Sequence, residues 1–149
     1  MRSMLPGMRT ILALTAMFAA LATPADAHAQ GKQVISLPGA NPNPTLSAGI
    51  RVGDMLFLSG QLGGNDSTIE GQTKASLENI KKVLDAAGTT VDKVVKCTVF
   101  LTDVKDFAKM NTAYTAFFTK EPPARSTVVV AALVRPVAKI EIECIASMK

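Results

Sequence analysis

Histidine is nearly absent from this chain, which contains one, His28, among 149 residues. His28 lies in an N-terminal segment that we expect to be removed, so the remaining chain has no imidazole for a Ser-His-Asp relay or a histidine-ligated metal site. The chain also has no tryptophan, a single tyrosine and no glycine-rich phosphate loop. Any chemistry must therefore come from carboxylates, arginine, hydroxyls, amides and the backbone, and we expect neither a metal nor a cofactor.

Residues 1–29 have the three parts of an export signal. Arg2 and Arg9 form its positive region, residues 10–21 are apolar, and small residues precede the expected cleavage point after Ala29. The apolar run is shorter than the roughly 20 residues of a membrane-spanning helix, and no cysteine follows it for lipid attachment. We therefore expect an exported protein, periplasmic or secreted, in which residues 30–149 form one domain without a membrane span.

Basic residues exceed acidic ones only slightly, with a formal net charge of +4. The only basic groupings are Lys81-Lys82 and the Lys93/Lys96 pair, and the chain lacks the interleaved aromatic residues that stack on bases. A solvated surface explains these lysines better than a nucleic-acid interface does.

The two cysteines, Cys97 and Cys144, occupy apolar positions of two alternating segments. Buried free thiols are the simplest interpretation. Export to an oxidising compartment would also permit a disulfide, provided that the two segments are neighbouring strands.

Hydrophobic periodicity predicts strands that alternate with helices after an irregular, proline-rich segment at residues 38–44. The expected strands are 34–37, a hairpin over 50–60 with its turn at Gly53-Asp54, 91–101, 126–134 and 139–146. The expected helices are 69–87, which ends at Gly88, and a second one that is capped by Thr102 or Asp103 and ends before Pro122. The second helix has an aromatic inner face, which is more typical of a core than of a ligand site: Phe107, Met110, Tyr114, Phe117 and Phe118.

This order of elements predicts an α+β fold, one mixed sheet with both helices packed on a single face. Residues 94–101 and 128–133 are nevertheless apolar on both sides, and no further element can cover the second face. We therefore expect an oligomer, with sites at the seams between chains near Ser59, Arg125 and Glu141.

Arg125 is the strongest single clue to function, because it stands at the entrance of an apolar strand. A guanidinium remains charged in proteins and presents a planar fork of donors, so at such a position it needs a carboxylate partner. That carboxylate can be internal, in an ion pair, or it can be brought by a ligand.

Several segments, in order along residues 51–143, carry a family resemblance. They are Arg51-Val52-Gly53-Asp54, Ser59-Gly60-Gln61, residues 79–88, Val94 to Asp103, Asp106-Phe107 with Met110-Asn111 and Tyr114, Pro123-Ala124-Arg125-Ser126, and Ile140-Glu141-Ile142-Glu143. With these segments the chain resembles the YjgF-type RidA (reactive intermediate deaminase A) family of imine and enamine deaminases.

The resemblance implies a chorismate-mutase-like fold and a homotrimer. It further implies clefts between subunits in which small 2-imino acids, such as 2-iminopropanoate and 2-iminobutanoate, are hydrolysed to 2-oxo acids and ammonia without a cofactor. Arg125 matches the carboxylate-binding arginine and Glu141 the carboxylate that orients water, while Ser59, Gly60 and Asn111 match residues lining the cleft. Two plainer interpretations stay open: Glu141 as an outward-facing strand residue, and Asn111 as a solvent-facing helix residue.

Two positions depart from the family pattern. Leu46 stands where relatives have a substrate-facing tyrosine, and Thr127 stands where many have cysteine. The alternative to a deaminase is therefore a non-catalytic trimer of the same fold that binds small carboxylates or protects unfolded proteins.

Overall fold

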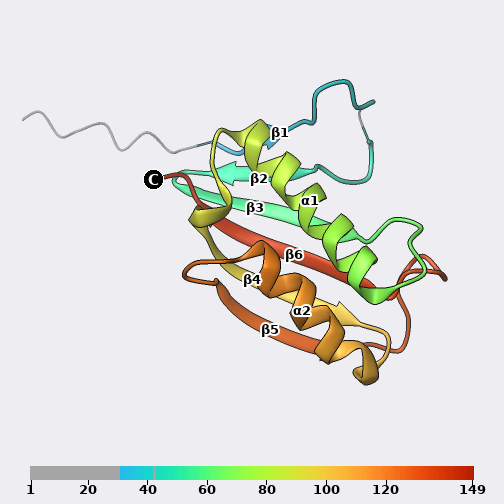
Figure 1. The fold of residues 1–149 in the computed structure, drawn as a ribbon. Coiled ribbons are helices and arrows are strands. Elements are labelled where there is room, and N and C mark those ends of the chain that lie inside the picture. The colour runs from blue at the N-terminus through green and yellow to red at the C-terminus, as the bar shows by residue number, and fades with distance from the viewer. Residues whose placement is uncertain (1–30, 42) are drawn as a thin grey trace, which may run out of the picture.

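The computed structural model describes residues 31–41 and 43–149. The expected export signal, with His28, lies outside the described residues. Within them, two helices lie side by side on one face of a six-stranded sheet (Figure 1). The α+β architecture expected from the sequence is confirmed. In the same ranges, no helix is both long and apolar enough to cross a membrane.

The strands follow the order β1-β2-β3-β6-β4-β5 across the sheet, and β4 and β5 are the parallel pair. The strands are β1 (Gln33–Ile35), β2 (Gly49–Val52), β3 (Met55–Leu62), β4 (Val94–Leu101), β5 (Ala124–Val129) and β6 (Ile140–Ser147). The helices are α1 (Ile69–Ala87) and α2 (Phe107–Phe117). The last strand therefore inserts between β3 and β4 and becomes the centre of the sheet.

Helix α1 has the bounds that the sequence predicts. The Thr68 hydroxyl accepts a hydrogen bond from the Gly71 amide at its start, which satisfies one of the free N–H groups of the first turn. Gly88 ends the helix with a φ of 79°, a left-handed conformation that favours glycine. Between these ends, Leu77 and Ile80 are fully buried against the sheet.

Two strands differ by three residues or more from their predicted bounds at one end, and the others by one or two. β4 begins at Val94 and not at Val91, because residues 91–93 form a 3₁₀ turn in which the Lys93 amide donates to the Thr90 carbonyl. β5 covers residues 124–129 and not 126–134. Its partner β4 ends at Leu101, whose carbonyl accepts from the Val130 amide, so the following residues have no strand to pair with.

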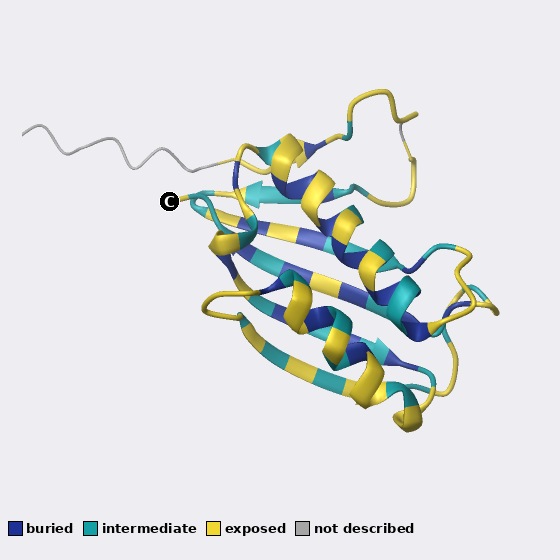
Figure 2. Ribbon diagram, viewed as in Figure 1, coloured by how far each residue is buried: buried dark blue, intermediate teal, exposed yellow. Residues whose placement is uncertain are grey.

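The sheet is covered on one side only. Leu56 and Leu58 point toward the helices and are buried, whereas Met55, Phe57 and Val128 point the other way and are 37%, 46% and 45% exposed. Figure 2 shows this alternation along the central strands and no buried band along the edge strand β5. A single chain thus leaves apolar residues of this face uncovered.

Cys97 and Cys144 form a disulfide, so the interpretation as free thiols was wrong. The two residues are direct partners in the antiparallel β4–β6 pairing, with Cα atoms 4.1 Å apart, and both side chains are buried. The sequence could not show this pairing, because it depends on the late strand β6 lying beside β4.

Candidate functional site

Arg125 lies beneath helix α2. It is the β4–β5 ladder partner of the buried Cys97, so its side chain points to the helix side of the sheet. Its guanidinium carbon lies 4.5 Å from the centre of the Tyr114 ring and 5.9 Å from that of Phe107, and Nη1 lies 4.0 Å from the Met110 sulfur. No ion pair formed by the described residues includes Arg125, so an internal ion pair is excluded there.

Two buried hydroxyls near Arg125, those of Tyr114 and Thr127, have no hydrogen-bond partner among the described residues. Thr127 is two residues beyond Arg125 on β5 and therefore points to the same side of the sheet. Burial raises the pKa of Tyr114 to about 12, against the opposing effect of the Arg125 charge, so the phenol is a neutral donor near pH 7. A hollow of about 240 Å³ opens beside these groups, and Phe107 and Thr127 are among its lining residues.

Asn111 lies on the same side of α2 as the residues around Arg125. It follows Phe107 by four positions and precedes Tyr114 by three, which places all three side chains on one helix face. Asn111 is half-buried, so its side chain is shielded from solvent only in part. Arg125 and Asn111 form one group of candidate site residues.

Glu141 lies on β6 against the backbone of β3. Its carboxylate covers Gly60, since a Cβ added to Gly60 would occupy the same space as the Glu141 side chain. The adjacent Ser59 donates its hydroxyl hydrogen bond to the Ser47 carbonyl at 2.6 Å. This bond ties the segment that contains Leu46, which is 55% exposed, to β3. Glu141, Gly60 and Ser59 form a second group.

The two groups lie on opposite faces of the sheet. Glu141 pairs with Phe100 across β4–β6, and Phe100 pairs with Val128 across β4–β5. Val128 is three residues beyond Arg125, and side chains an odd number of residues apart on a strand point in opposite directions. One chain therefore brings Arg125 together with Asn111, and Glu141 together with Ser59 and Gly60, but does not bring the two groups together.

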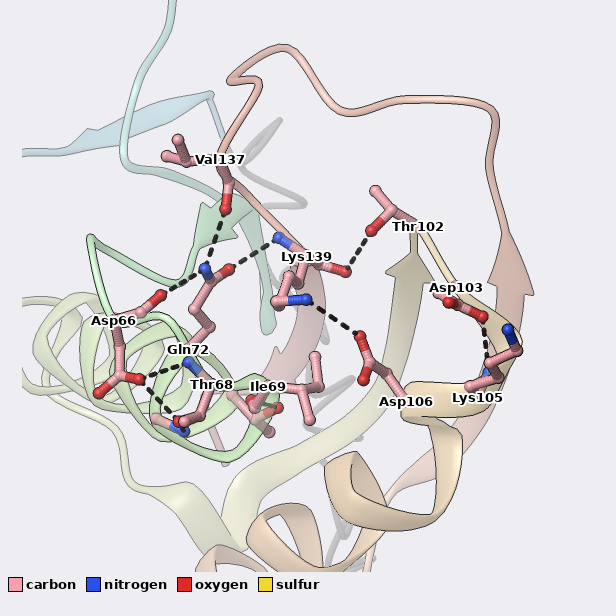
Figure 3. Close-up of polar contacts among 12 residues, drawn as sticks. Asp66, Thr68, Ile69, Gln72, Thr102, Asp103, Lys105, Asp106, Val137 and Lys139 are labelled. Atoms are coloured by element: carbon pink, nitrogen blue, oxygen red, sulfur yellow. Dashed lines mark hydrogen bonds and ion pairs between the residues drawn. The ribbon is translucent and has the colours of Figure 1, made fainter.

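A buried glutamine, Gln72, binds the segment that leads into β6, up to Lys139, two residues before Glu141 (Figure 3). The Gln72 side-chain nitrogen donates to the carbonyls of Asp66 and Val137, at 2.7 and 3.0 Å. Its oxygen accepts from the Lys139 amide at 2.8 Å. All of its hydrogen bonds go to backbone groups, so Gln72 joins the N-terminal end of α1 to the segment that delivers Glu141.

The roles of Gln72 and of the Tyr114 contact to Arg125 were not predicted from the sequence. The available signal for Gln72 was its helical spacing, since it precedes the buried Ser76 and Ile80 by four and eight positions. No comparable signal existed for the contact between Tyr114 and Arg125, because it depends on how α2 crosses β5. In the described ranges, no three histidine, cysteine or acidic side chains are grouped to bind a metal ion.

Comparison with known proteins gives consistent matches over most of the chain. The chain is 45% identical over 107 residues to the 2-iminobutanoate/2-iminopropanoate deaminase of Escherichia coli K12, covering 66% of this chain and 83% of that protein. It is 47% identical over 107 residues to a RutC family protein of Saccharolobus solfataricus, covering 67% of this chain and 84% of the relative.

Solved structures agree with these matches. The YjgF gene product of E. coli superposes with a TM-score of 0.73 at 38% identity, over 78% of this chain and 99% of that one. E. coli TdcF with bound serine superposes with a TM-score of 0.71 at 36% identity, over the same shares. Residues 39–148 match the family described as Endoribonuclease L-PSP. The chain therefore belongs to the Endoribonuclease L-PSP family, which is the YjgF/RidA family.

Proposed function

We propose that the protein hydrolyses small 2-imino acids, such as 2-iminopropanoate and 2-iminobutanoate, to 2-oxo acids and ammonia without a cofactor. The observation that carries the proposal is the guanidinium of Arg125, which rests on aromatic rings and is unpaired within the described chain. Such a cation is suited to a ligand carboxylate. The deaminase of E. coli is a relative at 45% identity, and the similar TdcF was solved with serine, which carries a carboxylate.

In the proposed reaction, Arg125 binds the substrate carboxylate through two parallel hydrogen bonds. Glu141 holds a water molecule against the imine carbon and accepts its proton as the carbon–oxygen bond forms. Passed to the imine nitrogen, that proton completes the tetrahedral carbinolamine. Glu141 then accepts the hydroxyl proton of the carbinolamine and passes it to the same nitrogen, so that the carbon–nitrogen bond breaks, ammonia leaves and the carbon–oxygen double bond forms. The net change is the addition of one water and the release of one ammonia.

We propose that a second copy of the chain completes each site. Arg125 and Glu141 lie on opposite faces of one sheet, so a substrate that touches both must lie between two chains. The uncovered apolar face provides the surface for such assembly. The assembly proposed is a homotrimer, in which three equivalent seams each receive Arg125 from one chain and Glu141 from its neighbour.

The direct test is the rate at which the chain from Gln30 onward accelerates hydrolysis of freshly generated 2-iminobutanoate over the spontaneous reaction. Arg125→Ala should abolish binding and acceleration while the assembly stays intact, because it removes the counter-charge and not a core side chain. Glu141→Gln should lower kcat more than it raises KM. A parent protein without acceleration, or two variants with parental rates, would reject the proposal.

Mixing the two variants tests the shared site. If Arg125→Ala and Glu141→Gln chains are unfolded together and refolded, about a quarter of the seams should combine an intact Arg125 with an intact Glu141. Activity of the mixture should then exceed that of either variant alone. No recovery in a correctly assembled mixture would show that both groups must come from one chain.

We also propose that the protein is exported and that residues 1–29 are its signal. The Cys97–Cys144 disulfide supports this proposal, because such bonds persist mainly in oxidising compartments. Expression of the full chain, followed by cell fractionation and N-terminal sequencing, should locate a form that begins near Gln30. Retention of Met1 on a cytoplasmic product would contradict it.

A second candidate function, carboxylate binding or client protection without turnover, is favoured by one residue. Leu46 is 55% exposed and offers no hydroxyl where the resemblance implies a tyrosine. Tight binding of 2-oxobutanoate without imine hydrolysis would select this candidate.

A further inference from the structure

The guanidinium of Arg125 lies in an aromatic pocket provided by α2. The Tyr114 ring is the nearer surface, with its centre 4.5 Å from the guanidinium carbon, and Phe107 is the more distant, at 5.9 Å. Tyr114 is 3% exposed, whereas 41% of Phe107 is exposed. The contact with Tyr114 is therefore both closer and better shielded from water.

The Tyr114 ring is itself held in place by a second ring. Its centre lies 4.7 Å from that of Phe118, at an interplanar angle of 42°, and Phe118 packs edge-on against Phe117 at 5.0 Å. Tyr114 and Phe118 belong to the buried core. The surface under Arg125 is thus fixed by the core and not by flexible surface groups.

A ring and a carboxylate hold a guanidinium in different ways. A carboxylate occupies the N–H donors at the edge of the group, whereas an aromatic ring attracts the cation through its π face. Apart from Nη1, which faces the Met110 sulfur at 4.0 Å, the donors that lie in the plane of the guanidinium then remain free for a ligand. A cation that is already oriented also loses less freedom when the ligand binds.

We propose that Tyr114 is a positioning residue, whose ring holds the Arg125 guanidinium in the orientation that receives the substrate carboxylate. The identity of that ligand rests on the proposed function above. The Tyr114 hydroxyl has no hydrogen-bond partner among the described residues, so the ring performs this role without it. Tyr114→Phe is therefore the matched control for Tyr114→Leu, which removes the ring at the same buried place.

The first measurement is the dissociation constant of 2-oxobutanoate by titration calorimetry for the parent and both variants. Tyr114→Phe should stay within about twofold of the parent, and Tyr114→Leu should bind about tenfold more weakly, a loss that lies within the range of cation–π contacts. In turnover, Tyr114→Leu should raise KM more than it lowers kcat. A general loss of folding would change both values and the assembly, which sizing and circular dichroism check.

The second measurement requires no destabilising variant. In the ligand-free parent, the Nε–H proton of Arg125 should show an upfield ring-current shift by NMR, kept in Tyr114→Phe and lost in Tyr114→Leu. A parent without this shift, or a folded Tyr114→Leu that binds 2-oxobutanoate as the parent does, would overturn the inference. Equal weakening in Tyr114→Phe would also overturn it, since the hydroxyl would then be the active part. A parent that shows the shift and binds 2-oxobutanoate but hydrolyses no imine would reject the deaminase and leave the role of Tyr114 intact.

Discussion

Removal of the Cys97–Cys144 disulfide should destabilise the protein substantially. The bond closes a loop with a sequence separation of 47 residues. In the chain-entropy treatment, a loop of this size restricts the unfolded chain by about 14 cal/mol/K, which is about 4 kcal/mol of stability at 25 °C. For a domain of this length that loss corresponds to a fall in Tm of roughly 15 °C.

The perturbation is the Cys97→Ala/Cys144→Ala double variant, since both side chains are buried and serine would place hydroxyls in the core. Parent and variant are melted at one protomer concentration, with and without reductant, because assembly makes Tm depend on concentration. The Tm of the parent should fall on reduction, and the Tm of the variant should be low with and without reductant. Equal Tm values for the oxidised and the fully reduced parent, with reduction verified by mass, would refute the loop-entropy argument. Two free thiols in the denatured, unreduced parent would refute the disulfide itself.

Three further predictions concern single residues. Gly60→Ala puts a methyl group where the Glu141 carboxylate lies, so kcat should fall at least tenfold. The Tm should change by only a few degrees, because the displaced group is the end of a flexible side chain. An unchanged kcat would contradict the placement of Glu141. Leu46→Tyr restores the hydroxyl implied by the family pattern and should accelerate imine hydrolysis, whereas an unchanged rate would show that this hydroxyl is dispensable. Burial raises the pKa of Tyr114 to about 12 in the folded protein, against about 10 in the unfolded chain. The unfolded state therefore loses the phenol proton first, and stability should fall between about pH 10 and 12. Denaturant titrations should show a smaller fall for Tyr114→Phe, and parallel curves would contradict the pKa shift.

The helices and most strands could be predicted because their signals are local. The spacing of apolar residues and the stop at Gly88 gave α1 its observed bounds. The end of β5 could not be predicted in the same way, since residues 130–134 are apolar enough for a strand but lie beyond the end of β4. The sequence favoured free thiols over the disulfide, because only the insertion of β6 beside β4 brings Cys97 opposite Cys144.

The candidate site was predictable in its residue types more than in its geometry. The sequence placed Arg125 at the entrance of β5, and its demand for a carboxylate follows from the chemistry of the guanidinium alone. Its aromatic support depends on the crossing of α2 over β5, a contact between residues 11 positions apart in different elements. The placement of Arg125 and Glu141 on opposite faces of the sheet depends on how the strands are paired. A shift of one residue in the pairing would turn one of these side chains to the other face.

The opposed directions of Arg125 and Glu141 have a consequence for where the proposed exported enzyme could work. If each site needs two chains, catalytic capacity depends on the encounter of copies, and activity per chain falls once the protein is diluted below its assembly constant. A population confined in a periplasm would keep its activity. Chains that diffuse away from the cell would stay folded, because their disulfide stabilises them, but they would lose activity as they become dilute.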